Sequence, residues 1–297
     1  MSAAWEGPRP TPVRMLGKSV SLAEVLHQGK TKIGEGIRTA MSWIALQDKD
    51  MQTRDIDLAR IGSYFLIAGP PKSGKTTALS TIAIALSAEL DPGQFRFALV
   101  TPKRGEQNRL DALTTLPHCL GQAKTDKTLD NLLTVLEQEA ENRLDIDPED
   151  SRPLARLFLL LDDFHLLSTR TSPESMSRLE ELARRSGDIR MTIMLTVPST
   201  ILSTLAGPLI RQAKSWRSGI WLQSTDGLES NIVGVKMPVN LKGKKLPPGR
   251  GFLYDPGGQE LIQLASPEVA WKAQPERPGS VDDWVEHILE KSNDPHA

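Results

Sequence analysis

Residues 69–76, Gly-Pro-Pro-Lys-Ser-Gly-Lys-Thr, constrain the fold of this chain more than any other stretch. Gly69 and Gly74 let the backbone curl so that successive N–H groups point at one anion. The apolar residues 64–68 before the loop are typical of a buried strand, and residues 77–90 after it, rich in Ala, Leu and Ile, are typical of a helix. The positive N-terminal end of this helix strengthens the same anion site. Strand, glycine-containing loop and helix in this order predict a phosphate-binding loop, the Walker A motif.

This loop indicates that the chain binds ATP with Mg²⁺. Lys75 is placed to reach the β- and γ-phosphates, and the Thr76 hydroxyl is placed to bind Mg²⁺. We also predict a catalytic role for Lys75. We expect this lysine to face solvent, so that Lys75→Ala abolishes ATP binding and leaves the fold intact. The expected ATP-binding residues are Gly69, Pro70, Pro71, Lys72, Ser73, Gly74, Lys75, Thr76 and Thr77.

A second motif, at residues 157–163, fits the same chemistry. The five apolar residues 157–161 predict a strand buried on both faces, as parallel strands are. Asp162 follows this strand in the Walker B position, so Asp162 and Thr76 are the predicted metal ligands. Asp163 is where an acid could orient the attacking water, and we predict that it is catalytic. Adjacent carboxylates also end many strands for solubility alone, so the upstream loop is what favours the functional interpretation.

Further apolar stretches complete a sheet. Residues 95–101, 191–197 and 218–223 are predicted strands, and residues 126–143 and 172–187 are predicted amphipathic helices. The threonine near the end of the second of these strands, Thr196, either senses the γ-phosphate or is simply a buried strand residue. This alternation of strands and helices predicts an α/β fold, namely a three-layer P-loop NTPase with a mainly parallel central sheet.

The chain divides into three expected segments. We expect an N-terminal lead-in with a side sheet, a P-loop ATPase core, and a linker with a C-terminal amphipathic helix, at residues 1–62, 63–265 and 266–297 respectively. In the lead-in we predict a strand at 13–16, a helix at 21–26 and a strand pair at 41–46 and 52–58. Late in the core we predict a helix at 205–213 and a hairpin of 252–254 with 260–265. The C-terminal helix opens with Ser280 and Asp283, which have the spacing of a capping box.

The composition excludes several classes of protein. Lys and Arg number 36 against 37 Asp and Glu, so the formal net charge of −1 gives no overall attraction to nucleic acid or to an anionic membrane. We therefore expect no specific nucleic-acid partner. The sequence has no run of 18 apolar residues and no apolar signal-peptide core, so we expect no membrane span. Cys119 is the only cysteine, which excludes an intramolecular disulfide and fits a reducing cytoplasm.

Several stretches together resemble the FtsK/SpoIIIE superfamily of ring-forming ATPases. More narrowly, they look like the C-terminal ATPase module of EccC/EssC, the membrane ATPase of type VII secretion. The resemblance runs from about Trp5 to about Leu264 and is carried by residues 5–8 with 13–16, 69–77, 116–118, 158–167 (FLLLDDFHLL) and 246–251 (LPPGRG). The chain departs from the pattern at Asp163, where active members resemble each other in having glutamate.

The resemblance implies a RecA/FtsK-like module from a longer chain that holds other ATPase modules and can form a ring. It implies a place on the cytoplasmic side of the bacterial cell membrane and engagement of exported helical proteins of the WXG100/Esx kind. The aspartate at position 163 implies slow hydrolysis by the isolated module. An arginine finger could come from Arg104, Arg184, Arg185 or Arg250.

Other interpretations stay open. A DNA translocase of the same superfamily would need Lys and Arg along its channel, and the net charge and the lack of a DNA-reading winged-helix segment argue against it. A non-hydrolysing module could use nucleotide only to regulate cargo binding. For either secretion role we expect an apolar cargo groove away from the phosphate loop. Residues 216–221 supply bulky side chains for it, and the helix at 281–291 could occupy it.

Overall fold

The computed structural model describes residues 15–33, 41–57, 61–102, 109–146, 154–223 and 227–293. Several predictions lie partly or wholly outside these residues: the stretch 5–8, the first half of the strand at 13–16, the last residue of the strand at 52–58, the arginine-finger candidate Arg104, and parts of the three expected segments 1–62, 63–265 and 266–297. Within them, Met15 and Leu16 are not part of a strand, so the predicted strand at 13–16 is wrong for these two residues.

The described strands form one sheet in the order β3-β2-β11-β10-β9-β4-β8-β7-β5-β6, with β1 paired to β11. The bounds are β1 Val20–Ser21, β2 Met41–Gln47, β3 Thr53–Asp57, β4 Tyr64–Gly69, β5 Phe95–Val100, β6 Cys119–Ala123, β7 Arg156–Leu161, β8 Met191–Pro198, β9 Gly219–Leu222, β10 Arg250–Asp255 and β11 Gly258–Ser266. All neighbours from β9 to β6 are parallel, and β10, β11, β2 and β3 continue the sheet antiparallel. The predicted hairpin is β10 and β11, and the predicted side-sheet strands β2 and β3 join the same sheet through β11.

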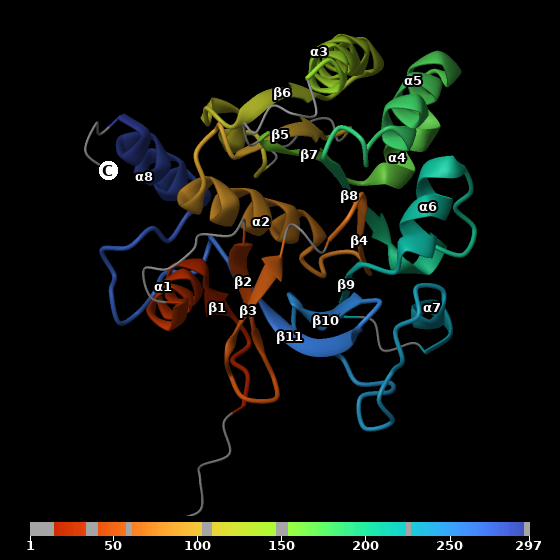
Figure 1. Ribbon diagram of the computed structural model, residues 1–297. Coiled ribbons are helices and arrows are strands. Elements are labelled where there is room, and N and C mark those ends of the chain that lie inside the picture. The colour runs from red at the N-terminus through yellow and green to blue at the C-terminus, as the bar shows by residue number, and fades with distance from the viewer. Residues whose placement is uncertain are drawn as a thin grey trace, which may run out of the picture.

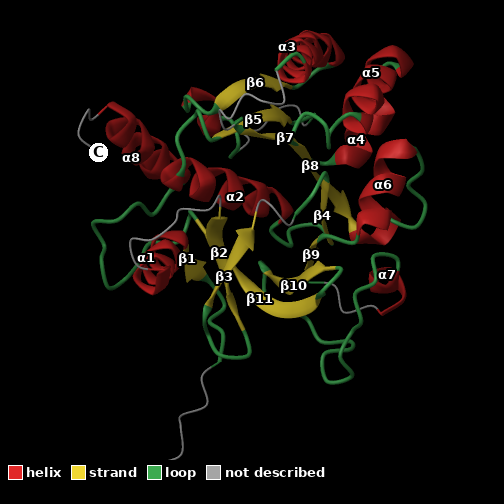
Figure 2. Ribbon diagram, viewed as in Figure 1, coloured by secondary structure: helices red, strands yellow, loops and turns green. Residues whose placement is uncertain are grey.

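Helices cover both faces of the sheet, so the predicted three-layer α/β fold is confirmed (Figure 2). Their bounds are α1 Leu22–Ile33, α2 Lys75–Glu89, α3 Asp126–Leu144, α4 Phe164–Arg170, α5 Pro173–Arg184, α6 Pro208–Trp216, α7 Gly227–Asn231 and α8 Val281–Asn293, with 3₁₀ turns at Ala112–Thr115 and Ser199–Ile201. Side chains of α1, α2 and α8 join one apolar core, and those of α3, α5 and α6 join the other. Strand β4 serves both, since Phe65 and Ile67 belong to the first core and Leu66 and Ala68 to the second. Burial on both faces explains why the central parallel strands β4 and β7 are apolar runs.

The sheet curves around α2, which is the central helix of the fold (Figure 1). Residues 78–88 of α2 are buried without interruption, and the helix contacts strands as far apart in the sheet as β2 and β5. A helix buried on all sides needs no amphipathic stripe, and its Ala-, Leu- and Ile-rich sequence reflects this position. The phosphate loop therefore leads into the most enclosed helix of the molecule.

The C-terminal helix α8 docks on the core. Its predicted capping box is present, because the Asp283 N–H donates to Ser280 Oγ (3.1 Å) and the Ser280 N–H donates to Asp283 Oδ2 (3.0 Å). Its buried Trp284 and Ile288 lie against α2 and the turn Ala112–Thr115. Residues 216–221, which lie at α6 and β9, are away from α8, so this helix does not cover their side chains (Figure 1).

Candidate functional site

The phosphate loop has the tight curvature that its glycines predict. Gly74, just before α2, has a left-handed backbone with φ of 102°, and Lys72 has φ of 62°. A Cβ at Gly69 would lie 2.5 Å from Ser73 Oγ and 2.8 Å from the Leu222 carbonyl oxygen. The loop thus folds so closely over the end of β4 that its first position accepts only glycine.

Lys75 is buried, so the expectation that it faces solvent is wrong. As the first residue of α2 it is 8% exposed, and its side chain folds back across the loop. The ammonium donates to the carbonyl oxygens of Gly69 (3.1 Å) and Pro70 (2.9 Å). The charge is thereby held inside the curve of the loop, where a phosphate would meet it. Lys75 also joins the two ends of the loop, so its removal should disturb the loop as well as ligand binding.

The two predicted metal ligands meet, although they are 86 residues apart. Thr76 Oγ1 lies 3.1 Å from Asp162 Oδ1 and 3.0 Å from Oδ2, and the hydroxyl donates to this carboxylate. The parallel sheet explains the contact. Strands β4 and β7 end at the same edge, with β8 between them, so the phosphate loop that follows β4 and leads to Thr76 meets Asp162, the residue after β7, at that edge.

Thr196 joins both aspartates. It is fully buried near the end of β8; its hydroxyl donates to Asp162 Oδ1 (2.8 Å) and accepts from the Asp163 N–H (2.7 Å). Asp163 caps α4 in a left-handed backbone conformation (φ 48°, ψ 53°). The interpretation of Thr196 as a buried strand residue agrees with its position, but its role in fixing the two carboxylates was not predicted. A polar residue at the end of the strand next to the Walker B strand was the available signal.

The glycine-rich loop at 246–251 packs on the phosphate loop. The Gly249 N–H donates to the Ser73 carbonyl oxygen (2.9 Å), and the Gly249 carbonyl accepts from the Leu264 N–H (2.8 Å). Gly249 has φ of 75°, and a Cβ there would lie 2.8 Å from Gln263 Nε2. Sequence reasoning used this loop only as part of a resemblance. The structure makes it a second layer that supports the phosphate loop.

A cavity of about 300 Å³ opens beside the phosphate loop. Gly74 and Thr77 form the side nearest the loop. The remaining walls come from the segment that leads into β1, the loop at 246–251, the end of β11 with the residues after it, and the chain before the 3₁₀ turn at Ala112–Thr115. They comprise Lys18, Ser19, Val20, Arg109, Pro248, Gly249, Gln263, Leu264, Ala265, Ser266 and Val269. Its position and size suit the base and ribose of a nucleotide whose phosphates occupy the loop.

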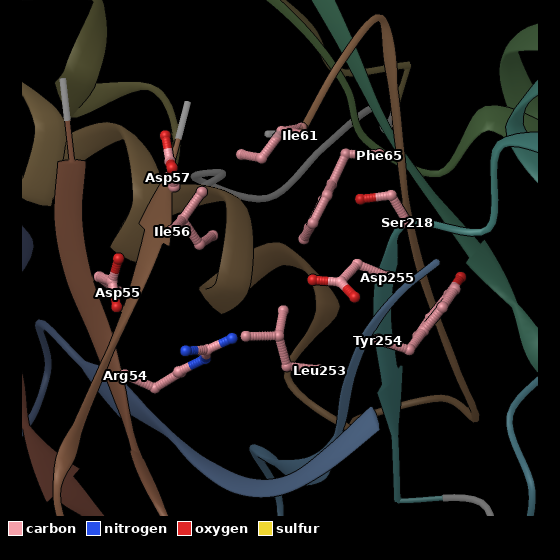
Figure 3. Close-up of a pocket in the computed structure, with 10 residues that line it drawn as sticks. All are labelled: Arg54, Asp55, Ile56, Asp57, Ile61, Phe65, Ser218, Leu253, Tyr254 and Asp255. Carbon is pink, nitrogen blue, oxygen red and sulfur yellow. The ribbon is translucent and has the colours of Figure 1, made fainter. Parts of the chain in front are cut away.

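A second cavity, of about 280 Å³, lies at the opposite end of β4 (Figure 3). Phe65 at the start of β4 and Leu253 of β10 provide apolar surface, and Asp55 and Asp255 are among the carboxylates around it. Since β4 separates this cavity from the phosphate loop, it is not part of the nucleotide site.

Three further side chains named in the sequence analysis, those of His118, Arg184 and Arg185, bind other groups of the same chain. His118 binds the Leu90 carbonyl oxygen at the end of α2 (2.7 Å), and burial lowers its pKa. Of the arginine-finger candidates, Arg184 pairs with Glu181 and Arg185 donates to Glu141 (2.8 Å). Each of these groups is thus accounted for by contacts within the chain.

Two negative findings hold for the described part of the chain. Its residues include no group of three His, Cys, Asp or Glu side chains that could hold a metal ion. Mg²⁺ at a phosphate site generally takes only one or two protein ligands, so such a group is not required. No helix in the same ranges is long and apolar enough to cross a membrane.

Comparisons with known proteins agree with this geometry. A model of the FtsK/SpoIIIE family matches residues 35–146, which include the phosphate loop. The ESX secretion system protein EccC of Thermomonospora curvata is 28% identical over 275 residues, covering 88% of this chain and 19% of that protein. The ESX-1 secretion system protein EccCb1 of Mycobacterium tuberculosis is 28% identical over 284 residues, covering 89% of this chain and 46% of that protein.

A solved structure gives the same result. ATPases 2 and 3 of Thermomonospora curvata EccC, in complex with a signal sequence peptide, match with a TM-score of 0.67 at 25% identity, over 88% of this chain and 46% of that one. The chain spans less than half the length of each of these relatives. Residues 35–146 match the FtsK/SpoIIIE family model, and the chain as a whole is similar to the EccC and EccCb1 proteins of ESX secretion systems.

Proposed function

We propose that this chain is an ATP- and Mg²⁺-binding module of a type VII secretion ATPase. The observation that carries the proposal is the contact between Thr76 and Asp162 beside a preformed phosphate loop. In the proposed site, loop N–H groups and Lys75 hold the phosphates, while Thr76 and Asp162 hold Mg²⁺. The metal, when bound, supplies positive charge that neutralises the phosphates. Asp163 orients the attacking water.

The wider role is part of the proposal. Residues 63–265 are the ATPase core, residues 1–62 lead in from an upstream module, and residues 266–297 carry the helix that docks on α2. The matched EccC structure holds two ATPases and this chain covers 46% of it, which favours one module of a chain with several. Such a chain would work at the cytoplasmic side of the membrane, as a ring in its full-length form. A DNA translocase is less favoured because the net charge is −1.

ATP binding is tested by Lys75→Ala. Loss of the ammonium should abolish Mg·ATP binding in calorimetric titration. Because Lys75 is buried and binds two loop carbonyls, we also expect a loss of about 1–2 kcal/mol in the free energy of unfolding. Lys214→Ala is the matched control, since the partly buried Lys214 also donates to a backbone carbonyl oxygen, that of Leu205 (3.0 Å), but lies outside the phosphate loop. Equal ATP affinity in the two variants would refute the site.

Thr196→Val tests whether the Thr196 hydroxyl holds the proposed metal ligand Asp162 in place. The substitution keeps the shape but removes the hydroxyl that holds Asp162 and Asp163. We expect ATP affinity measured with Mg²⁺ to fall about tenfold and affinity measured with EDTA to stay unchanged. The control is Thr192→Val in the same strand, because its buried hydroxyl binds the Gly62 carbonyl oxygen (2.7 Å) far from the loop. Both variants should lose stability, but only Thr196→Val should lose the Mg²⁺-dependent affinity.

We expect slow hydrolysis because of Asp163. An aspartate is one C–C bond, about 1.5 Å, shorter than a glutamate at the same position. A misplacement of about 1 Å can cost on the order of a hundredfold in rate. The backbone cannot shift to compensate, because the Asp163 N–H is held by Thr196 and the next residue begins α4.

Phosphate release by the unmodified chain should therefore run well below about 1 s⁻¹. Asp163→Glu should raise it by up to about a hundredfold, and Asp162→Glu, the same lengthening at the metal position, should not. An absent neighbour that supplies an arginine would limit the rate in both cases. Turnover of several per second by the unmodified chain would overturn this argument. No turnover in Asp163→Glu, even with the rest of the full-length chain present, would favour the regulatory alternative.

We propose further that the module binds a helical segment of an exported protein. The matched EccC structure contains a signal sequence peptide, which supports such binding in a relative. Of the bulky side chains at residues 216–221, Trp221 is fully buried and so does not offer a surface to a cargo. Trp216 is 40% exposed, and its indole N–H donates to the Ile61 carbonyl oxygen (3.0 Å), at the edge of the cavity in Figure 3. The cavity has an apolar floor, and its charged lining is three carboxylates, Asp55, Asp57 and Asp255, against one arginine, Arg54, which fits a basic amphipathic helix.

A helical C-terminal peptide of a WXG100 protein should bind this chain and change its tryptophan fluorescence. Leu253→Gln, in the cavity, should weaken binding at least tenfold. Leu261→Gln is the control, because Leu261 is partly buried in the other core on the opposite face of the sheet. If both variants bind the peptide as tightly as the unmodified chain, the cargo does not use this cavity.

A further inference from the structure

The Arg250 guanidinium donates hydrogen bonds to a segment that is distant from it in the sequence. Its Nη2 donates to the carbonyl oxygens of Leu16 (3.1 Å) and Gly17 (2.8 Å), and its Nε donates to Gln263 Oε1 (2.9 Å). Burial lowers the pKa of this guanidinium. A partly buried arginine that binds two consecutive carbonyls, more than 230 residues away, fixes the path of that segment.

The same loop holds the phosphate loop. Gly249, next to Arg250, donates its N–H to the Ser73 carbonyl (2.9 Å). Gln263, which accepts from Arg250, donates to the Pro248 carbonyl oxygen (3.0 Å). The loop at 246–251 therefore binds the phosphate loop on one side and the entering segment at Leu16 and Gly17 on the other.

The entering segment forms a wall of the cavity beside the phosphate loop. Lys18, Ser19 and Val20 line this cavity opposite Pro248 and Gly249. Val20 then pairs with Ala265 of β11. Leu16 and Val20 are buried in the apolar core and Val20 pairs with β11, while the backbone carbonyls of Leu16 and Gly17 are held by Arg250, so the position of the wall depends in part on Arg250.

We propose that Arg250 is a positioning residue, which holds the entering segment, residues 16–20, as the wall of the nucleoside part of the nucleotide site. This inference rests on the proposed ATP site. It also gives Arg250 a role within its own subunit in place of the arginine finger. The segment arrives from the N-terminal side of the module. Because it is a wall of the nucleotide site, nucleotide binding and docking of this segment stabilise each other, and the coupling is reciprocal.

The experiment separates the wall from the phosphate loop by comparing two ligands. Mg·ATP contacts both, whereas Mg·tripolyphosphate contacts only the phosphate loop. We expect Arg250→Ala to weaken ATP binding about tenfold or more and tripolyphosphate binding less than twofold. Arg250→Lys keeps the positive charge but lacks the several N–H donors of the guanidinium, so it should lose an intermediate amount of ATP affinity. This variant replaces Arg250→Ala in the experiment if Arg250→Ala does not fold.

Hydrogen exchange gives a readout without any nucleotide. Amides of residues 16–21 should exchange faster in both Arg250 variants, and in the unmodified chain ATP should slow them. The matched control is Arg143→Ala, because Arg143 also binds two backbone carbonyls, of Ala155 (2.8 Å) and Ile189 (3.0 Å), at the far side of the molecule. This variant should lose stability but keep both affinities and the exchange at 16–21.

The outcomes distinguish the two proposals. If the unmodified chain binds neither ATP nor tripolyphosphate, the proposed ATP site fails. If it binds ATP but Arg250→Ala weakens both ligands equally, or leaves exchange at 16–21 unchanged, the positioning role of Arg250 is refuted. Unchanged ATP affinity in Arg250→Ala, with reduced turnover only in the assembled full-length protein, would likewise refute it and assign Arg250 to a neighbouring site.

Discussion

The hydrogen bonds that Thr76 and Thr196 donate to Asp162 are the constraint on which the candidate site depends. They join the ends of three adjacent parallel strands, β4, β8 and β7, and they exist because parallel strands bring their C-terminal ends to one edge. A buried carboxylate without donors would be costly, so the two hydroxyls stabilise its charge before any metal arrives. The edge is therefore organised in advance, and a bound Mg²⁺ would replace contacts that already hold the carboxylate in place.

The phosphate loop is also organised before a ligand binds, but the charge that it holds in place is positive. Lys75 places its ammonium on the Gly69 and Pro70 carbonyls, and the Gly249 N–H binds Ser73 from outside. A phosphate that enters must compete with the loop's own carbonyls for the lysine. The loop keeps its curvature through the exchange, because Gly249 and the left-handed Gly74 do not depend on the ligand.

The sequence was sufficient to predict the elements that a local pattern specifies and the strands that are buried on both faces. The strands β4 and β7 are apolar runs because both faces are covered, and this pattern identifies them directly. Strand β6 was missed, because Cys119–Ala123 contains a glycine and lies at the sheet edge with little apolar signal. Helix α4 was missed because its cap, Asp163, has a left-handed backbone that no pattern reveals. The burial of Lys75 depends on how the loop folds, so its residue type alone pointed to solvent.

Contacts across the antiparallel half of the sheet could not be predicted, because they join residues more than 170 positions apart. The phosphate loop meets Gly249, and Leu16 and Gly17 meet Arg250, only because β10 and β11 insert between β9 and β2. The cavity beside the phosphate loop is consequently built from the phosphate loop, the entering segment and the last hairpin together. In a module assembled in this way, a ligand in that cavity and the docked entering segment stabilise each other directly, because the segment is itself a wall of the cavity.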